Sequence, residues 1–174
     1  EMYHVTPDTL IPRPDTEHVV EKAIKLMPAN GRFADLCTGS GAIGISILNN
    51  SEAAFAILVD ISQKAIEVAI KNAERNGVLD KCKFICEDLN DLLLEENSLD
   101  LIVSNPPYVK KQVIKTLEKE CSFEPYIAFD GGEDGMYFYD LTESLRQTLK
   151  KKVDVLNREQ LNENPMLVNE ILKD

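Results

Sequence analysis

Four residues that follow an apolar run could bind the amino group of a substrate through hydrogen-bond acceptors. Asn105-Pro106-Pro107-Tyr108 comes directly after the apolar residues 99–104. Two consecutive prolines fix φ at about −65° and remove two backbone donors, so the Asn105 side chain and the carbonyls of Asn105 and Pro106 remain as acceptors. Asn-Pro is also common in turns, but an aromatic residue after Asn-Pro-Pro favours a functional site. Acceptors at the end of a strand suit a substrate NH2 group.

A glycine-rich turn follows another apolar run, residues 33–36. It reads Cys37-Thr38-Gly39-Ser40-Gly41 and leads into a predicted helix whose first N–H groups are free. Glycines let a ligand approach the backbone closely, and the helix amino terminus favours negative charge. The spacing by itself also matches dinucleotide-binding loops. Asp35, just before the turn, favours a cationic amino group as the ligand because its carboxylate repels a pyrophosphate.

Further acidic residues stand where the next two predicted strands end. Asp60 ends the second strand, where a carboxylate can bind both hydroxyls of a ribose. Asp88 and Leu89 follow the third, where a carboxylate can accept from the amine of adenine and a leucine can pack on the ring. Each aspartate alone is as well explained by a helix cap or turn. Together with Asp35, their placement suits S-adenosylmethionine better than a nicotinamide dinucleotide.

The elements that position these residues alternate between helical and strand patterns, which is typical of an α/β sheet. The strands are nearly continuous apolar runs, as expected for parallel strands buried on both faces. Residues 153–156 and 166–168 could each add a short strand. We predict strands over 32–36, 54–59, 83–86 and 99–104, and helices over 15–27, 42–48, from the cap Ser62 to the stop Asn76-Gly77, and over 134–149.

Composition indicates a globular protein of one domain: 174 residues, 44% hydrophobic and 28% charged. No apolar stretch reaches the length of a membrane span, and the amino end does not resemble a signal peptide, so we expect a cytoplasmic protein without membrane contact. The net charge of −11 disfavours nucleic acid as a partner, and Lys150-Lys151-Lys152 is too short a cluster to offset it. The four cysteines lack the spacing of metal ligands, so we expect reduced thiols and no metal site.

Four segments stand out along the chain. They are Thr9-Leu-Ile-Pro-Arg-Pro-Asp-Thr-Glu17, Asp35-Leu-Cys-Thr-Gly-Ser-Gly41, Asn105-Pro-Pro-Tyr108 and Phe123-Glu-Pro-Tyr-Ile-Ala-Phe-Asp-Gly-Gly-Glu-Asp-Gly135. In this order they resemble the release-factor glutamine methyltransferases of the HemK or PrmC type. The second and third are shared with many amino-directed methyltransferases, including enzymes that act on adenine, whereas the first and last are particular to this family.

The resemblance implies S-adenosylmethionine as cofactor and a glutamine side chain of a peptide-chain release factor as substrate. It implies that residues 37–41 hold the methionine part, with Asp35 near its amino group, and that the segment with Arg13 covers the cofactor and helps bind substrate. Asn105, Pro106 and Tyr108 are the implied catalytic residues, and Pro107 also contacts substrate. Cofactor contacts are implied for Asp35, Cys37, Thr38, Gly39, Ser40, Gly41, Asp60, Asp88, Leu89 and Asn105.

The implied fold is the Rossmann-like sheet of class I S-adenosylmethionine-dependent methyltransferases, with helices on both faces. The resemblance covers about residues 3–149, which divides the chain into a covering segment with the first helix (1–30), a methyltransferase core (31–149) and an unmatched tail (150–174). We expect neither the family's amino-terminal helical domain nor its final strand pair. A sheet edge left unpaired by such a tail favours a homodimer.

Other functions fit part of the pattern. An adenine-N6 methyltransferase uses the same glycine loop and Asn-Pro-Pro-Tyr motif, and the acidic charge argues against it. A truncated, inactive remnant that still binds cofactor is favoured by the unmatched tail. A nicotinamide dehydrogenase is a weak alternative, because hydride transfer has no role for residues 105–108.

Overall fold

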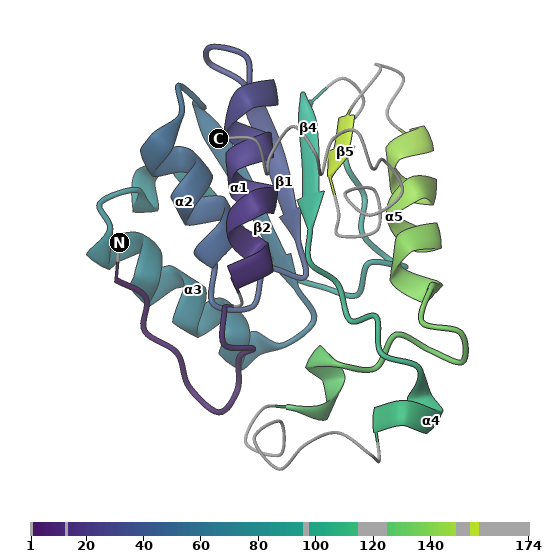
Figure 1. The fold of residues 1–174 in the computed structure, drawn as a ribbon. Helices are drawn as coiled ribbons and strands as arrows, with labels where there is room; N and C mark the ends of the chain where they lie inside the picture. Colours follow the sequence, from purple (N-terminus) through teal and green to yellow (C-terminus); the bar gives the residue numbers. More distant parts are fainter. Residues whose placement is uncertain (1, 13, 96–97, 115–124, 149–153, 157–174) are drawn as a thin grey trace.

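One parallel sheet forms the centre of the molecule. A computed structural model of the protein describes residues 2–12, 14–95, 98–114, 125–148 and 154–156. Within them the sheet has the strand order β3-β2-β1-β4-β5, with every neighbouring pair parallel (Figure 1). The predicted α/β class is therefore confirmed. The strands are β1 (Arg32–Leu36), β2 (Phe55–Asp60), β3 (Cys82–Cys86), β4 (Leu101–Ser104) and β5 (Asp154–Leu156).

Helices cover both faces of this sheet, as predicted (Figure 1). One face packs against α1, α2 and α3, and the other against α5 and the connection between β3 and β4. Alternate strand residues point to opposite faces: Phe33 and Leu58 to the first, Leu36 and Val59 to the second, all fully buried. The helices are α1 (Pro14–Leu26), α2 (Ala42–Asn50), α3 (Gln63–Arg75), α4 (Lys111–Ile114) and α5 (Tyr137–Thr148), with short 3-10 turns η1 (Leu79–Lys81) and η3 (Tyr126–Ala128).

Helix α3 begins and ends as its sequence predicts. The Ser62 side chain accepts from the backbone N–H of Ala65 at 3.3 Å, which satisfies one of the free donors of the first turn. At the other end Gly77 adopts φ +73°, and the N–H of Val78 donates to the carbonyl of Ala73 at 3.0 Å. These caps fix both ends of α3, and the first of them places the start of the helix directly after the end of β2.

The second half of the chain adds to the sequence prediction. Strand β5 forms within the short strand that residues 153–156 could supply, so residues 154–156 of the tail that the motifs left unmatched belong to the sheet. Helix α5 begins at Tyr137, because the Asp134 carboxylate accepts from the N–H of Met136 and makes a turn first. Helix α4 was not predicted. The strand predicted at 166–168 and the lysines 150–152 lie outside the described residues. The expectation that the final strand pair is absent also concerns that part of the chain.

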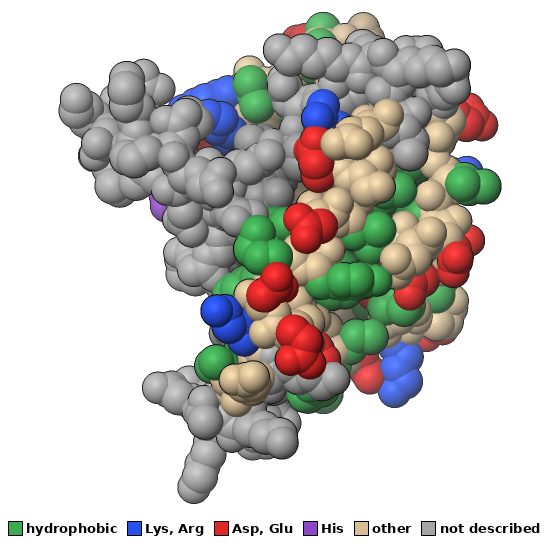
Figure 2. Space-filling model, turned by 90° about the vertical axis from the view of Figure 1, so that its right-hand side faces the viewer, with side chains coloured by type: hydrophobic (Ala, Val, Ile, Leu, Met, Phe, Trp, Pro, Cys, Tyr) green, Lys and Arg blue, Asp and Glu red, His purple; other side chains and the backbone are tan. Residues whose placement is uncertain are grey.

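Acidic side chains are spread over the face that carries α5, with hydrophobic side chains exposed between them (Figure 2), in keeping with the net charge of −11. Among the described residues no helix is both long and apolar enough to cross a bilayer, and no three His, Cys, Asp or Glu side chains gather to hold a metal ion. Cys37, Cys82 and Cys86 are free thiols, and Cys121 lies outside the described residues.

Candidate active site

The carboxyl ends of the strands bring the predicted site residues to one edge of the sheet. Parallel pairing aligns Leu36 of β1 with Val59 of β2 and with Ser104 of β4, and it aligns Asp60 with Cys86 of β3. A cleft with an empty volume of about 1090 Å³, including its open mouth, lies at this edge. Of the predicted residues it is lined by Cys37, Thr38, Gly39, Ser40, Asp60, Asp88, Leu89, Asn105 and Pro107.

The glycine loop forms the floor of the cleft in a left-handed backbone conformation. Gly39 and Gly41 have φ +55° and +80°, and Cys37 has φ +58°, which is uncommon for a residue with a side chain. A Cβ at Gly41 would lie 2.9 Å from Ile45 Cδ1 and 3.1 Å from Ala69 Cβ, and these contacts together with the left-handed φ favour glycine at this position. The N–H of Thr38 donates to the Val59 carbonyl at 2.9 Å and fastens the loop to β2.

Asp35 lies under this floor and not on the cleft wall. Its side chain is fully buried, and Oδ2 accepts from Thr38 Oγ1 at 2.7 Å and from the Gly44 N–H at 3.0 Å. Oδ1 is buried with no hydrogen-bond partner in the described part of the chain. The net effect of these surroundings raises the Asp35 pKa to about 7. Burial is the largest cause, the two hydrogen bonds lower the pKa, and the charge of Asp60 raises it. Asp35 therefore joins the loop to α2 and places a buried acidic group beneath the cleft.

Asp60 lines the cleft directly and also shapes its floor. Oδ2 accepts from the Gly39 N–H at 2.9 Å, and Oδ1 accepts from the Ser62 N–H at 2.9 Å. Burial raises the pKa of this carboxyl, and the hydrogen bonds from the backbone of Ser62, Gly39 and Ile61 lower it. Each carboxylate oxygen has lone pairs for a second bond, so Asp60 can still accept from ligand hydroxyls.

The surroundings of Cys37, which lines the cleft, favour its neutral thiol. Burial raises its pKa above the ordinary range, and the charges of Asp60 and Asp35 raise it further. Because the thiolate is the reactive form of cysteine, these surroundings keep Cys37 inert.

A hydrogen-bonded bridge closes the Asp88 end of the cleft. Asp88 Oδ1 accepts from the backbone N–H and from Nδ2 of Asn90, at 2.9 and 2.7 Å. The Asn90 amide pairs with the Tyr137 hydroxyl at 2.8 Å through Nδ2, and Tyr137 Oη lies 3.0 Å from Asn90 Oδ1. Since Tyr137 belongs to α5, this bridge fixes Asp88 and Leu89 relative to the helix that covers the second face of the sheet.

The Asn-Pro-Pro-Tyr segment leaves β4 at the opposite end of the cleft. Asn105 and Pro107 line the cleft, Pro106 is buried beside them, and Tyr108 is 39% exposed outside the lining residues. Behind it runs the segment 125–135. The Val109 N–H donates to the Phe129 carbonyl at 2.9 Å, and the Gly131 N–H donates to the Val109 carbonyl at 3.0 Å. Two of the four matched motifs are therefore one structural unit.

Glycine is required where these two motifs touch. A Cβ at Gly131 would lie 2.7 Å from Tyr108 Cα, and one at Gly135 would lie 2.6 Å from the Tyr108 carbonyl oxygen. Neither contact can be relieved by turning a flexible side chain, because both partner atoms belong to the backbone. The Gly-Gly-Glu-Asp-Gly run thus sets the backbone position of Tyr108.

We expect Gly135→Ala to unfold at lower denaturant and to displace Tyr108. Its cost combines about 1–2 kcal/mol for a left-handed alanine with about 1–3 kcal/mol for overpacking. Gly77→Ala is the matched control, since Gly77 has φ +73° and a Cβ added there would have no atom within 4 Å. Chemical denaturation of both variants measures the difference. Equal losses would show that the Tyr108 contact contributes nothing.

Other predicted residues lie elsewhere, and some functional residues were not predicted. Gly41 supports the loop without lining the cleft, and Arg13 lies outside the described residues. Asn90 and Tyr137 gave no signal in the sequence, because these two partners are 47 residues apart. Further unpredicted lining residues are Asp8, Leu10, Pro12, Thr16, Ala42, Ile43, Ile61, Ser62, Ala65, Glu87, Pro125, Ile127, Ala128 and Phe138.

Comparison with known proteins agrees with this architecture. The family model described as "Methyltransferase small domain" matches residues 17–120. This chain belongs to that family. The match runs from α1 through the glycine loop and the Asn-Pro-Pro-Tyr segment to beyond α4, so it contains most of the cleft.

Curated relatives of this methyltransferase small domain are named release factor glutamine methyltransferase. The relative from Clostridium acetobutylicum is 38% identical over 153 residues, which cover 86% of this chain and 54% of the relative. The relative from Bradyrhizobium diazoefficiens is 40% identical over 144 residues, which cover 79% and 48%. The resemblance predicted from four motifs is therefore confirmed. The chain spans about half the length of these curated relatives.

Solved structures share the fold of this methyltransferase small domain. The catalytic domain of hMettl16 in complex with MAT2A 3′UTR hairpin 6 gives a TM-score of 0.68 at 17% identity, covering 87% of this chain and 58% of that one. A Geobacter sulfurreducens S-adenosylmethionine-dependent methyltransferase in complex with S-adenosyl-L-homocysteine gives 0.56 at 19% identity, covering 90% and 50%. At such identities the likeness concerns the fold, and it confirms the predicted class I methyltransferase sheet.

Proposed function

We propose that this chain is the catalytic part of an S-adenosylmethionine-dependent methyltransferase that modifies the side-chain amide nitrogen of a glutamine in a peptide-chain release factor. The observation that carries the proposal is the opening of Asn105 into the same cleft as the glycine loop and Asp60. The names of the curated relatives support the choice of substrate.

The residues that line the cleft suit the proposed cofactor chemically, with carboxylates for its cationic and hydroxyl groups and apolar side chains for its ring. Asp35 places a buried carboxyl group under the floor, with Oδ1 unpartnered among the described residues, so in its ionised form it attracts a cationic amino group above the loop without touching it. Asp60 accepts from ribose hydroxyls, and Leu89 and Phe138 offer apolar surface beside Asp88 for adenine.

The residues of the β4 end then orient the amide. An amide nitrogen is a poor nucleophile because its lone pair is delocalised. The Asn105 side-chain oxygen and the Pro106 carbonyl accept the two N–H groups of the target, which fixes the nitrogen and stabilises the positive charge that develops on it. Tyr108 packs on the planar substrate amide. The cofactor supplies a methyl group that leaves sulfur for nitrogen, with the C–S electron pair remaining on sulfur.

The proton balance needs no strong base. As the C–N bond forms, the amide nitrogen becomes cationic and its N–H acidic. One proton then leaves to water. The other hydrogen stays on the nitrogen and keeps its hydrogen bond to the carbonyl oxygen. No side chain has to deprotonate a neutral amide.

Incubating the chain with radiolabelled S-adenosylmethionine, and with either a release factor or an adenine-containing RNA, tests the substrate. We expect label on the release factor, and peptide mass spectrometry should place one methyl group on a glutamine. Label on the RNA alone would support the adenine alternative. Cofactor binding without transfer to either would support the inactive remnant.

The cofactor site has its own test. We expect Asp60→Ala to weaken binding of S-adenosylmethionine by about 10- to 100-fold, because a hydrogen bond to a charged group contributes about 1.5–3 kcal/mol. Calorimetry measures the dissociation constant. Asp100→Ala is the control, since Asp100 accepts from the Arg32 N–H at the opposite edge of the sheet. Unchanged affinity in Asp60→Ala would remove Asp60 from the site.

A further inference from the structure

The amino-terminal segment, residues 3–12, which we call the strap, forms part of the cleft wall. It runs past α3 before the chain enters α1 (Figure 1). Asp8, Leu10 and Pro12 of the strap line the cleft. Because the strap has no regular secondary structure, it can form a stable cleft wall only if contacts with the rest of the molecule fix its position.

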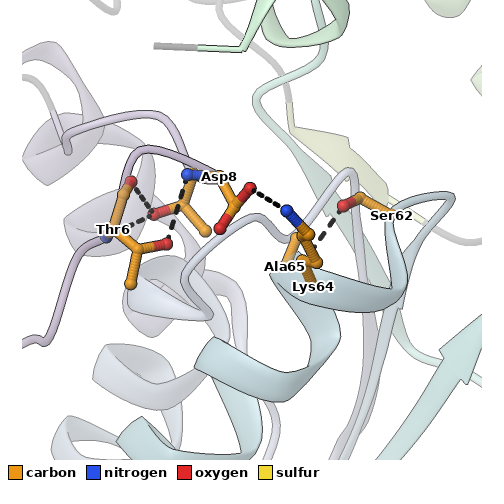
Figure 3. A network of polar contacts seen from close by, with 6 residues as sticks. Thr6, Asp8, Ser62, Lys64 and Ala65 are labelled. Carbon is orange, nitrogen blue, oxygen red and sulfur yellow. Dashed lines mark hydrogen bonds and ion pairs between the residues drawn. The ribbon is translucent and has the colours of Figure 1, made fainter. Parts of the chain in front are cut away.

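Two of these contacts involve side chains of the strap. The half-buried Tyr3 packs against the hydrophobic core, and its hydroxyl lies 2.6 Å from Ser46 Oγ of α2. Lys64 Nζ donates to Asp8 Oδ1 at 2.9 Å (Figure 3), and both of these side chains are exposed. An exposed ion pair contributes little to stability and is screened by salt. Tyr3 therefore anchors the start of the strap, and the ion pair adds little.

A local turn gives the strap its shape. The Thr9 N–H donates to the Thr6 carbonyl at 3.0 Å. The Asp8 N–H donates to Thr6 Oγ1 at 3.2 Å (Figure 3). Thr9 is fully enclosed although it is polar. The turn directs Asp8 toward Lys64, at the start of the helix that Ser62 caps.

The third contact is buried and reaches the cofactor loop as well. Asn72 of α3 has no exposed surface. Its Oδ1 accepts from the His4 N–H at 2.7 Å, and its Nδ2 donates to the His4 carbonyl at 2.9 Å and to the Ser40 carbonyl at 2.8 Å. One amide thus satisfies two backbone groups of the strap and one of the loop.

The position of Asn72 in α3 is costly unless it serves these contacts. It lies among the buried alanines and Ile66 on the apolar face of the helix, and asparagine is a weak helix former. An unpaired buried amide costs about 1–3 kcal/mol, so the complete set of partners explains why a polar side chain is stable here.

We propose that Asn72 is a positioning residue that couples the strap to the cofactor loop, so that the wall and the floor of the cleft are held in register for the ligand. The inference rests on the proposed function in taking S-adenosylmethionine as that ligand. Asn72 does not line the cleft, so it acts through Ser40 and the strap. Releasing either end of the coupling lowers affinity without removing a ligand contact.

The test detaches the strap from its own side. His4→Pro removes the N–H that donates to Asn72, whereas His4→Ala keeps it, and the His4 side chain is exposed. We expect His4→Pro and Asn72→Ala each to weaken S-adenosylmethionine binding about tenfold in calorimetry, and His4→Ala to bind like wild type. The double variant should lose less than the product of the two losses, because both break one coupling.

Hydrogen exchange separates this coupling from a general loss of stability. In His4→Pro without ligand we expect faster exchange in residues 38–41 as well as in the strap, with α5 unchanged. Faster exchange confined to the strap, or fully additive losses of affinity, would overturn the proposal. If wild type binds no S-adenosylmethionine, the proposed function fails, and exchange in the unliganded variants alone decides whether Asn72 couples the two segments.

Discussion

Asn105→Ala should lower the rate of methyl transfer by about 100- to 1000-fold while changing cofactor affinity only a few-fold. The reason is that the Asn105 oxygen accepts an N–H whose hydrogen bond strengthens as charge develops on nitrogen, and loss of one such preorganised group costs this much in other sites. Affinity is preserved because the loop and Asp60 hold the cofactor. Single-turnover transfer to a release factor, with calorimetry of the cofactor, separates the two effects.

A matched amide in another place provides the control for this prediction. Asn50 lies at the exposed end of α2, and its Nδ2 donates to the Ser46 carbonyl at 2.8 Å. We expect Asn50→Ala to transfer methyl groups at the wild-type rate. Equal losses of rate and affinity in Asn105→Ala would mean that Asn105 serves the cofactor alone. A wild-type rate would remove it from catalysis.

The parts of the site that the sequence predicted all follow from strand ends. Asp60 and Asn105 could be assigned to one edge because parallel strands with apolar runs must end together, and the register of β1 with β2 and β4 bears this out. The cap Ser62 and the stop at Gly77 were equally readable, since both depend on neighbouring residues.

The parts that the sequence did not predict depend on contacts between distant segments. Asn72 is read locally as a polar interruption of an apolar helix face, and its role is visible only once His4, 68 residues away, lies beside it. The need for Gly131 and Gly135 likewise comes from the Tyr108 backbone. Strand β5 has only three residues, so the sequence offered residues 153–156 as one of two possible short strands and its pairing with β4 came only from the structure.

Asp35 lies in a different place from the one that its motif suggests. The motif suggested a carboxylate in contact with the cofactor, but the side chain is enclosed beneath the loop. Hydrogen bonds from Thr38 and Gly44 fill Oδ2, and Oδ1 has no partner among the described residues. A negative charge there is unfavourable for folding and favourable for binding a cationic ligand. Removing the charge should therefore raise the stability of the protein and lower its affinity for the cofactor.

Burial is the main reason that the Asp35 pKa rises from 3.8 to about 7. The folded state therefore binds a proton more tightly than the unfolded chain, and this group contributes stability that is lost as pH rises from about 4 to about 7. The full difference is roughly 4 kcal/mol at about 1.4 kcal/mol per pKa unit. An asparagine in this position carries no charge at any pH, so we expect Asp35→Asn to be more stable than wild type at pH 8 and to lose this advantage at pH 4.

The gain at pH 8 should be about 1–3 kcal/mol, because the new amide N–H, like Oδ1, is buried without a partner among the described residues and offsets part of the difference. Denaturation at several pH values measures it. Asp80→Asn in the exposed turn η1 is the control and should change little.

Cofactor affinity should move the other way. Wild type should bind S-adenosylmethionine more tightly as pH rises through about 7, since an ionised Asp35 attracts its cationic groups. Asp35→Asn should bind about tenfold more weakly at pH 8 and without this pH dependence, which calorimetry across the same pH range measures. If Asp35→Asn is less stable than wild type at pH 8, the charge of Asp35 does not destabilise the fold. If the affinity of wild type does not change between pH 6 and 8, the charge does not contribute to cofactor binding.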